Sequence, residues 1–290
     1  MSPALASLTM AQVRTMLPPR PPDAHKGQNG HVLIVAGSRG MSGAAELCAR
    51  ATLRIGAGLV TGAIVASEYT AITHLLPEAL TLPLPEGPDG SLSADAFTVI
   101  QDYLEKRHIN VLAVGPGLSV NRAVAGVVKS LLETNLALVL DADGLNNMSA
   151  KDLADRPGLI ITPHIGEMAR LLEKPTEAIV REPVRVAEAF ARDYGVVCVL
   201  KGHRTVISDG QNTCRNTTGN QAMATGGMGD VLTGTIAGLL AQGLKPWDAA
   251  CAGVYLHGLA GDLARTSDRG LLASDVAEAL PKALSKIVRH

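Results

Sequence analysis

The chain has 290 residues, a formal net charge of −1 and 47% hydrophobic residues, enough for one large core or two modest ones. Only 2% of the residues are aromatic and neither sign of charge dominates, which excludes a basic nucleic-acid groove with stacking rings. No apolar run approaches membrane-spanning length, Met1–Met16 lacks the pattern of a signal peptide, and the four cysteines are scattered without metal-type pairing. We therefore expect a reduced, cytoplasmic protein that binds neither nucleic acid nor membrane.

An irregular lead-in, Leu17–Gly30, contains four prolines and precedes short apolar segments that alternate with helical patterns. The segments predicted as strands are mostly apolar without interruption, as strands covered on both faces are: His31–Ala36, Leu59–Val65, Val111–Val114, Leu138–Leu140, Leu159–Ile161 and Val196–Leu200. Helical patterns between them include Gly43–Ile55, Ala94–Lys106, Arg122–Thr134 and Val184–Tyr194. This alternation predicts an α/β fold with a mostly parallel sheet and helices on both sides.

The last third of the chain follows a different pattern. Thr205–Ser208 and Thr213–Arg215 predict an antiparallel hairpin at a sheet edge, because the turn-forming sequence Asp209–Asn212 separates them. The remaining segments are predicted to be helical: Val231–Gln242, Trp247–Arg265 and Ser274–Lys286. Since no shift in composition marks a linker and no internal repeat is found, we expect residues 1–290 to form a single domain.

Polar and glycine-rich loops follow the predicted strands. In an open parallel sheet, ligands bind at the carboxyl ends of the strands, and these loops fall there: Gly37–Gly43, Gly115–Ser119, Asp141–Asn146, Thr162–Glu167 and Lys201–Thr205. The first loop lacks the Gly-Lys-Ser/Thr ending of a Walker loop, and no Gly-x-Gly-x-x-Gly dinucleotide fingerprint follows a strand. Their shared position indicates a functional site at this edge of the sheet.

Each polar residue in these loops also has a purely structural interpretation. Asp141 and Asp143 could be turn and cap residues. His164 could bond a neighbouring carbonyl, and Glu167 could be a first-turn acid favoured by the helix dipole. Lys201 could be a surface lysine. Only their common placement favours the functional interpretation.

A glycine turn before the last group of helices is the most specific feature of the sequence. Gly226, Gly227 and Gly229 allow the backbone to curl tightly, and Asp230 stands where a helix begins. Four apolar residues then share one helical face: Leu232, Ile236, Leu239 and Leu240. Free N–H groups at such a helix start suit a phosphoryl group, beside which Asp230 could take a proton from an attacking hydroxyl. Asp230 could instead merely cap the helix, although capping does not explain three clustered glycines.

Several of these segments together carry a family resemblance that spans nearly the whole chain: residues 25–33, Gly115–Leu118, Asp141–Asn146, Thr162–Glu167, Lys201–Ile207 and Asn220–Gly243. They resemble the ADP- or ATP-dependent NAD(P)H-hydrate dehydratases. The resemblance implies a ribokinase-like fold, a three-layer α/β/α sandwich with a mostly parallel central sheet. We expect no counterpart of the epimerase domain that is fused to some members.

The resemblance implies a lyase that performs metabolite repair on NADHX and NADPHX, in which water has added at C6 of the nicotinamide ring. The family phosphorylates the C6 hydroxyl and then eliminates phosphate, which regenerates NADH or NADPH. Bacterial members use ADP and yield AMP, whereas eukaryotic members use ATP, so we expect ADP here. Magnesium is expected to offset the phosphate charge. Family members also tend to form tetramers, so a homotetramer is expected.

The resemblance also assigns catalytic and substrate-binding residues. Asp230 would be the base on the C6 hydroxyl and would contact the hydrate. Gly226, Gly227 and Gly229 would form the anion hole for the transferred phosphoryl group. The other residues of the hydrate pocket would be Ala44, Gly117 and His164.

A second set of residues would bind the nucleotide and the metal. The expected nucleotide contacts lie in two segments: Lys201, Gly202, His203, Arg204 and Thr205, then Asn220, Gly226, Gly227, Met228 and Gly229. Glu167 takes the place where related small-molecule kinases hold magnesium through water, and Asp143 is a weaker candidate for the same role.

The chain departs from the family pattern at three places. Ile165 stands where proline is usual, Gln221-Ala222 replaces a proline-containing pair, and Met228 stands where a small residue is usual. Because the anion hole uses backbone N–H groups, Met228 is not expected to break it. Any effect is expected on pocket shape or nucleotide preference.

Two other functions remain open from the residues alone. A kinase of the same fold, acting on a small alcohol, would use the same base, anion hole and nucleotide loop. A non-catalytic sensor of AMP or ADP would bind nucleotide without chemistry, although it would not need to retain Asp230 and the glycines.

Overall fold

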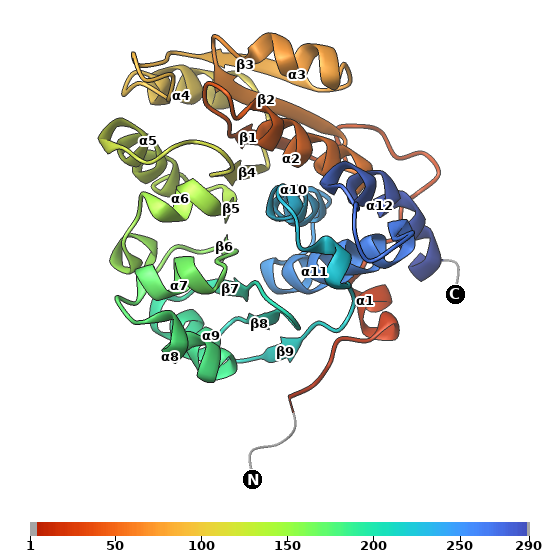
Figure 1. Cartoon of the computed structure of the whole chain (residues 1–290). Coiled ribbons are helices and arrows are strands. Elements are labelled where there is room, and N and C mark those ends of the chain that lie inside the picture. Colours follow the sequence, from red (N-terminus) through yellow and green to blue (C-terminus); the bar gives the residue numbers. More distant parts are fainter. Residues whose placement is uncertain (1–4, 289–290) are drawn as a thin grey trace.

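The computed structural model describes residues 5–288, in which a single nine-stranded sheet is covered by helices on both faces (Figure 1). The strands are β1 (His31–Val35), β2 (Leu59–Val65), β3 (Leu80–Leu84), β4 (Val111–Val114), β5 (Ala137–Leu140), β6 (Leu159–Ile161), β7 (Val197–Leu200), β8 (Val206–Ser208) and β9 (Thr213–Arg215). They lie in the order β3-β2-β1-β4-β5-β6-β7-β8-β9. Pairing is parallel from β3 to β7 and antiparallel from β7 to β9.

The helices are α1 (Met10–Met16), α2 (Ser42–Arg54), α3 (Tyr69–Leu75), α4 (Ala96–Lys106), α5 (Arg122–Leu132), α6 (Ala142–Asn146), α7 (Ile165–Leu171), α8 (Thr176–Arg181), α9 (Pro183–Tyr194), α10 (Met228–Ala241), α11 (Pro246–Ala264) and α12 (Ala273–Val288). Two short 3₁₀ helices, η1 (Ala150–Leu153) and η2 (Gln221–Met223), complete the chain. One layer contains α2, α10, α11 and α12, and the other contains α4, α5 and α9 (Figure 1). On the first face, the helices α2, α10 and α11 contact β1, β2, β4, β5, β6, β7 and β8.

Helix α10 lies in the middle of the molecule. It contacts β1, β4 and β5 on one side and α2, α11 and α12 on the others. Every residue from Val231 to Ala241 is buried, so the expectation of a single apolar face was too narrow. Small residues let the neighbours come close: a Cβ added at Gly234 would lie 2.1 Å from the Cys48 carbonyl oxygen of α2. The sheet and three helices thereby fix the first turn of α10, where the glycines and Asp230 lie.

The predicted strands, hairpin and long helices are confirmed to within a few residues at their ends. The short elements β3, α1, α3, α6, α7 and α8 were not predicted. Strand β3 is the sheet edge, its side chains are partly exposed and it contains Pro83, features that weaken a strand signal. Helices of five to seven residues are too short to show a period. Cys198 is buried in β7 and belongs to the core.

None of the helices within residues 5–288 is both long and apolar enough to cross a membrane.

Candidate active site

The loops at the carboxyl ends of β1, β4, β5, β6 and β7 lie side by side. The Gly37 N–H donates to the Pro116 carbonyl at 2.8 Å, which joins the loops after β1 and β4. The Lys201 N–H donates to the Pro163 carbonyl at 2.8 Å, and His164 and Lys201 pair beyond the ends of β6 and β7. Parallel strands deliver their loops to one edge, so residues far apart in the sequence meet there.

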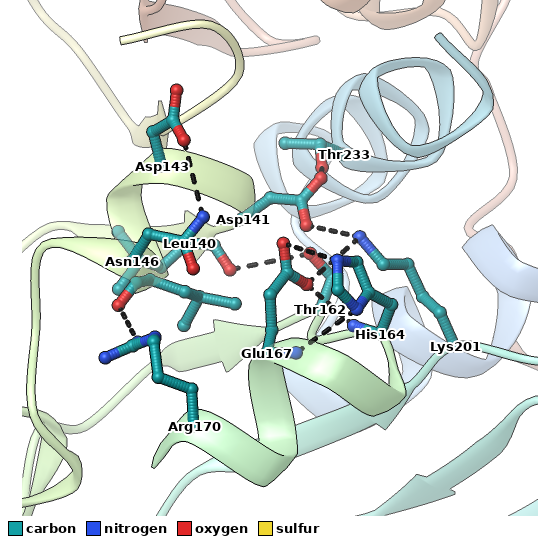
Figure 2. A network of polar contacts seen from close by, with 11 residues as sticks. Leu140, Asp141, Asp143, Asn146, Thr162, His164, Glu167, Arg170, Lys201 and Thr233 are labelled. Carbon is teal, nitrogen blue, oxygen red and sulfur yellow. Dashed lines mark hydrogen bonds and ion pairs between the residues drawn. The ribbon is translucent and has the colours of Figure 1, made fainter. Parts of the chain in front are cut away.

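A buried carboxylate links this edge to α10. The Asp141 Oδ1 atom accepts from Lys201 Nζ at 2.6 Å, and Oδ2 accepts from the Thr233 hydroxyl at 2.8 Å (Figure 2). The Asp141 side chain is 1% exposed and that of Lys201 is 19% exposed. Asp141 occupies the N-cap position of α6 but makes no cap hydrogen bond. The interpretations of Lys201 as a surface residue and of Asp141 as a cap are therefore wrong.

The charge of Lys201 is stabilised by its neighbours. Burial alone lowers the pKa of a lysine. Here the carboxylates of Asp141, Glu167 and Asp230 outweigh burial, and the pKa of Lys201 is raised. The residue is therefore a permanent cation at the strand ends.

His164 and Glu167 together begin helix α7. The His164 N–H donates to Glu167 Oε2 at 2.7 Å, and the Glu167 N–H donates to His164 Nδ1 at 3.2 Å. This reciprocal pairing is a capping box. Glu167 is thus an acidic residue in the first turn of a helix, which agrees with its purely structural interpretation. His164 differs from its structural interpretation, because it accepts a hydrogen bond from an N–H and does not bond a carbonyl. The imidazole remains 58% exposed, with Nε2 at 3.4 Å from Glu167 Oε1, while Glu167 is buried with Oε2 at 3.8 Å from Lys201 Nζ.

The glycine turn leads directly into α10. Gly227 has φ +84° and is the N-cap residue, so the helix begins at Met228, two residues before Asp230. Within the described chain, the N–H groups of Gly227, Met228, Gly229 and Asp230 donate to no backbone carbonyl. They lie at the positive end of the helix dipole and can receive an anion. A Cβ added at Gly229 would lie 3.4 Å from both Lys201 Nζ and Asp141 Oδ2, so the turn and the cation adjoin.

The pKa of Asp230 suits a base that acts near neutral pH. Burial raises its pKa most, and Asp141 and Asp143 raise it further, while Lys201 opposes them, which brings the pKa of Asp230 to about 7. Such a carboxylate holds a proton much more readily than an exposed aspartate does. In the first turn of α10, it lies beside the N–H groups just described. The interpretation of Asp230 as a simple cap is wrong, because Gly227 is the N-cap residue.

The expected hydrate-binding residues fall in two places. Gly117 and Ala44 are together, since a Cβ added at Gly117 would lie 3.1 Å from the Ala44 Cβ. Gly117 has φ +65° and its carbonyl accepts from the Ser38 hydroxyl at 2.8 Å. Nearby, Asp143 accepts from the Ser119 N–H at 2.8 Å, which ties the loop after β4 to α6. His164 belongs to a separate group, with Lys201 and Glu167.

The expected nucleotide-binding residues lie in two segments, which adjoin at Lys201 and Gly229. Residues 201–204 line a cavity of about 330 Å³ together with apolar side chains of α7, α8, α9, β7 and β8. Thr205 closes this loop by donating to the Gly202 carbonyl at 3.2 Å. Asn220 caps η2 and donates to Asp262 Oδ1 at 2.8 Å, and the Gly219 N–H donates to Asp262 Oδ2 at 2.9 Å. Asp262 of α11 thus holds the segment that leads to the glycine turn.

Comparison with known proteins decides the family of this site. A model of the NAD(P)H-hydrate dehydratase family matches residues 32–282. The chain belongs to that family. Both the predicted family and the predicted ribokinase-like fold are confirmed, since a ribokinase-like superfamily protein from Enterococcus faecalis has a TM-score of 0.85 at 28% identity, with 98% of this chain and 97% of that chain covered.

Two relatives and one solved structure illustrate the similarity. An ADP-dependent (S)-NAD(P)H-hydrate dehydratase from Neisseria meningitidis is 38% identical over 90% of this chain and 86% of its own length. A bifunctional NAD(P)H-hydrate repair enzyme from Moorella thermoacetica is 44% identical over 97% of this chain. The chain spans 54% of that relative, about half the length of the bifunctional relatives it matches. The Bacillus subtilis ADP/ATP-dependent NAD(P)H-hydrate dehydratase, co-crystallised with ATP and Mg²⁺, has a TM-score of 0.84 at 31% identity and covers 98% and 99% of the two chains.

Kinases share the dehydratase fold at a greater distance. A hydroxyethylthiazole kinase from Pyrococcus horikoshii has a TM-score of 0.61 at 12% identity, with 97% of this chain and 95% of that chain covered. This likeness shows a common fold alone. The architecture alone therefore does not distinguish a dehydratase from a kinase.

The carboxylates of this site do not fit a resident metal ion. Asp141 and Glu167 offer oxygen atoms of the kind that magnesium prefers. However, Lys201 Nζ lies 2.6 Å from Asp141 and 3.8 Å from Glu167, so an ammonium already occupies the position where an ion held by both carboxylates would lie. Among residues 5–288, no three His, Cys, Asp or Glu side chains gather closely enough to hold a metal.

Two residues of this network had no clear sequence signal. Thr233 follows Asp230 by three residues, so the helical period places both on one side of α10, but a threonine hydroxyl is too common to stand out. Asp262 lies in a helix far from the segment that it holds. Only the tertiary structure brings these side chains to the site.

Proposed function

We propose that this chain is an ADP-dependent (S)-NAD(P)H-hydrate dehydratase that converts NADHX and NADPHX back to NADH and NADPH. The observation that carries the proposal is Asp230, a partly buried base with a pKa of about 7 beside unpaired N–H groups and a fixed ammonium. A base, an anion-binding turn and a cation are the parts that phosphoryl transfer to a hydroxyl requires. The named activity of the relatives supports the choice of substrate.

In the proposed first step, Asp230 accepts the proton of the C6 hydroxyl as its oxygen attacks the terminal phosphorus of the nucleotide. The N–H groups of Gly227, Met228 and Gly229 receive the phosphoryl oxygens, and the Lys201 ammonium offsets their charge. Because α10 is packed on all sides, these groups do not need to reorganise during the reaction. Asp230, Gly227 and Gly229 are the proposed catalytic residues.

In the proposed second step, the ring nitrogen N1 supplies the electron pair that expels phosphate from C6. A proton then leaves C5, which restores the dihydropyridine ring. Phosphate is a better leaving group than hydroxide, which is the chemical reason for phosphorylating the hydroxyl first. The products are the reduced cofactor, AMP and phosphate when ADP is the donor.

Substrate and nucleotide are proposed to meet across the glycine turn. Ala44, Gly117, His164 and Asp230 would contact the hydrate. The nucleotide would lie against residues 201–205, Asn220 and the segment from Gly226 to Gly229. The cavity beside Lys201, lined by His203 and Arg204, supports a binding place for the nucleotide on this side.

Magnesium is proposed to enter with the nucleotide phosphates, whose charge it would reduce. Glu167 is the proposed protein contact with this ion through water, and Asp143 is the weaker candidate. This order is supported by the Lys201 ammonium, which lies 2.6 Å from Asp141 and 3.8 Å from Glu167 and so already occupies the position between these carboxylates. Magnesium commonly binds in this way, through one or two carboxylates together with substrate phosphates.

The wider expectations are proposals as well. A single continuous sheet supports one domain over residues 1–290. We also propose a homotetramer that acts in the cytoplasm, where its cofactor substrates would be available.

The deciding experiment follows the recovery of reduced-nicotinamide absorbance when the purified protein meets NADHX, magnesium and either ADP or ATP. We expect recovery with release of inorganic phosphate, faster with ADP than with ATP. Nucleotide binding without recovery from NADHX or NADPHX would refute the dehydratase and direct the search to small alcohols, since a kinase leaves a stable phosphorylated product.

A further inference from the structure

Asp141 uses both of its carboxylate oxygens in the interior of the protein. One accepts from Lys201 at the end of β7 and the other from Thr233 in α10. The Thr233–Asp141–Lys201 chain therefore joins the ends of two strands to the helix that carries the glycine turn (Figure 2). Thr233 is fully buried and Asp141 is 1% exposed, so water does not compete for these bonds.

Lys201 occupies the position that a divalent cation would take between Asp141 and Glu167. Asp141 and Glu167 are both buried, and the single ammonium lies within 4 Å of each. A divalent ion between these carboxylates would have to displace an amine that is hydrogen-bonded at 2.6 Å. The same amine adjoins Gly229, on the side from which a phosphoryl group would approach the turn.

The structure assigns to Lys201 the role of a built-in cation, held by Asp141 and Thr233, that takes the place of a resident divalent metal between Asp141 and Glu167. A divalent cation then reaches the site only together with nucleotide phosphates. Asp141 and Thr233 are positioning residues, because they act on the phosphoryl group through Lys201. The link to phosphoryl transfer rests on the proposed function, whereas the link to metal binding does not.

The first test measures Mn²⁺ binding by electron paramagnetic resonance, with the full chain and no nucleotide. We expect no saturable site in the wild type and one site per chain in Lys201→Gln and Lys201→Met, since each leaves two buried carboxylates without their cation. Lys201→Arg retains a cation and is the matched control, expected to gain no site. Adding Glu167→Gln to Lys201→Gln is expected to remove the new site.

Two results would overturn the inference. One is saturable Mn²⁺ binding to the wild type that Glu167→Gln abolishes. The other is a lack of Mn²⁺ binding by folded Lys201→Gln and Lys201→Met proteins. Neither readout depends on turnover, so the inference and the proposed dehydratase activity fail separately.

The second test addresses the positioning residues. Thr233→Val preserves side-chain shape but removes the hydroxyl from Asp141, whereas Thr233→Ser retains a donor. We expect Thr233→Val to lower kcat several-fold more than Thr233→Ser, with the KM for ADP little changed. Without the hydroxyl, Asp141 holds Lys201 less firmly, and Lys201 then stabilises the transition state less well. Equal kcat in two variants of similar thermal stability would remove Thr233 from this role.

Discussion

At the scale of single residues, the site depends on what surrounds Asp230. An exposed aspartate has a pKa near 4 and is a weak base at neutral pH. Burial together with Asp141 and Asp143 moves the pKa of Asp230 to about 7, against the pull of Lys201. The Thr233–Asp141–Lys201 chain therefore places a negative and a positive charge near Asp230. Their opposing effects, together with burial, keep the pKa of Asp230 near neutral pH.

The pH dependence of catalysis should report this pKa. Asp230 must be ionised to accept a proton, so kcat/KM for NADHX is expected to rise about tenfold per unit below pH 7 and to level off above it. Asp230→Asn should lower turnover by about 10²- to 10⁴-fold while nucleotide affinity is retained. Steady-state rates and calorimetric titration with ADP measure both. A fully active Asp230→Asn enzyme would exclude Asp230 as the base.

The two glycines of the turn should respond differently to a methyl group. At Gly229 the added Cβ meets only Lys201 Nζ and Asp141 Oδ2, each at 3.4 Å. Gly229→Ala should therefore fold normally but lose most turnover, since the methyl shields the amine. At Gly227 the φ of +84° is strained for alanine, and the Cβ would lie 2.6 Å from a Leu47 carbon.

Gly227→Ala should consequently lose about 1–3 kcal/mol of stability. Thermal unfolding and turnover of the two variants, recorded in parallel, distinguish a blocked site from a weakened fold. Wild-type turnover in Gly229→Ala would show that the space beside Lys201 is not used.

At the scale of elements, α10 explains why the turn stays in place. Thr52 of α2 has its hydroxyl 2.8 Å from the Cys48 carbonyl and 3.0 Å from the Gly234 carbonyl of α10. Two helices approach this closely only where side chains are absent. A Cβ at Gly238 would lie 2.3 Å from a carbon of Ile55. Packing of α10 against α2 therefore helps to hold the glycine turn in place.

Gly234→Ala tests this packing. Its Cβ would lie 2.1 Å from the Cys48 carbonyl oxygen, which belongs to rigid helical backbone, so the helices must separate. We expect a loss of about 1–3 kcal/mol in unfolding free energy, with reduced turnover. The control is Gly126→Ala in α5, which is exposed with no atom within 4 Å of the added Cβ. That change should stabilise the protein by up to about 1 kcal/mol. Urea unfolding of both variants gives the comparison, and equal effects would contradict the packing argument.

The same elements show what a sequence can reveal. Central strands such as β1 and β4 were predictable because burial on both faces leaves an unbroken apolar run. The glycine turn was predictable because three glycines directly before a helix leave its first N–H groups accessible to an anion. Burial of α10 on every side was not predictable. The period of its apolar residues shows only one buried face, and helix α2, which covers another face, lies nearly 180 residues earlier in the sequence. Thr233 was missed for a related reason, because its partner Asp141 lies beyond the end of a distant strand.

At the scale of the whole molecule, two buried groups should set opposite dependences of stability on pH. Asp230 has its pKa raised to about 7, so the folded state retains a proton that the unfolded state releases near pH 4. The contribution of Asp230 to stability is therefore lost as the pH rises from about 4 to 7. Burial, assisted by Lys201, lowers the pKa of His257 to about 4, although a hydrogen bond with the Met228 backbone opposes the shift. Its Nε2 is enclosed and has no hydrogen-bond partner among residues 5–288. The contribution of His257 is lost as the pH falls from about 6.5 to 4.

These opposing trends can be separated by comparing variants with the wild type. Relative to the wild type, Asp230→Asn should gain on the order of 2 kcal/mol of unfolding free energy between pH 4.5 and pH 8, because it removes a buried charge that forms as the pH rises. Relative to the wild type, the unfolding free energy of His257→Gln should increase by a similar amount as the pH falls from 8 to 4.5. The reason is that the variant has no buried imidazole that must stay neutral. Urea unfolding at several pH values gives the two difference curves, in which titrations common to all three proteins cancel. Difference curves that are flat would mean that neither group is perturbed by burial, and the base proposed for catalysis would lose its physical support.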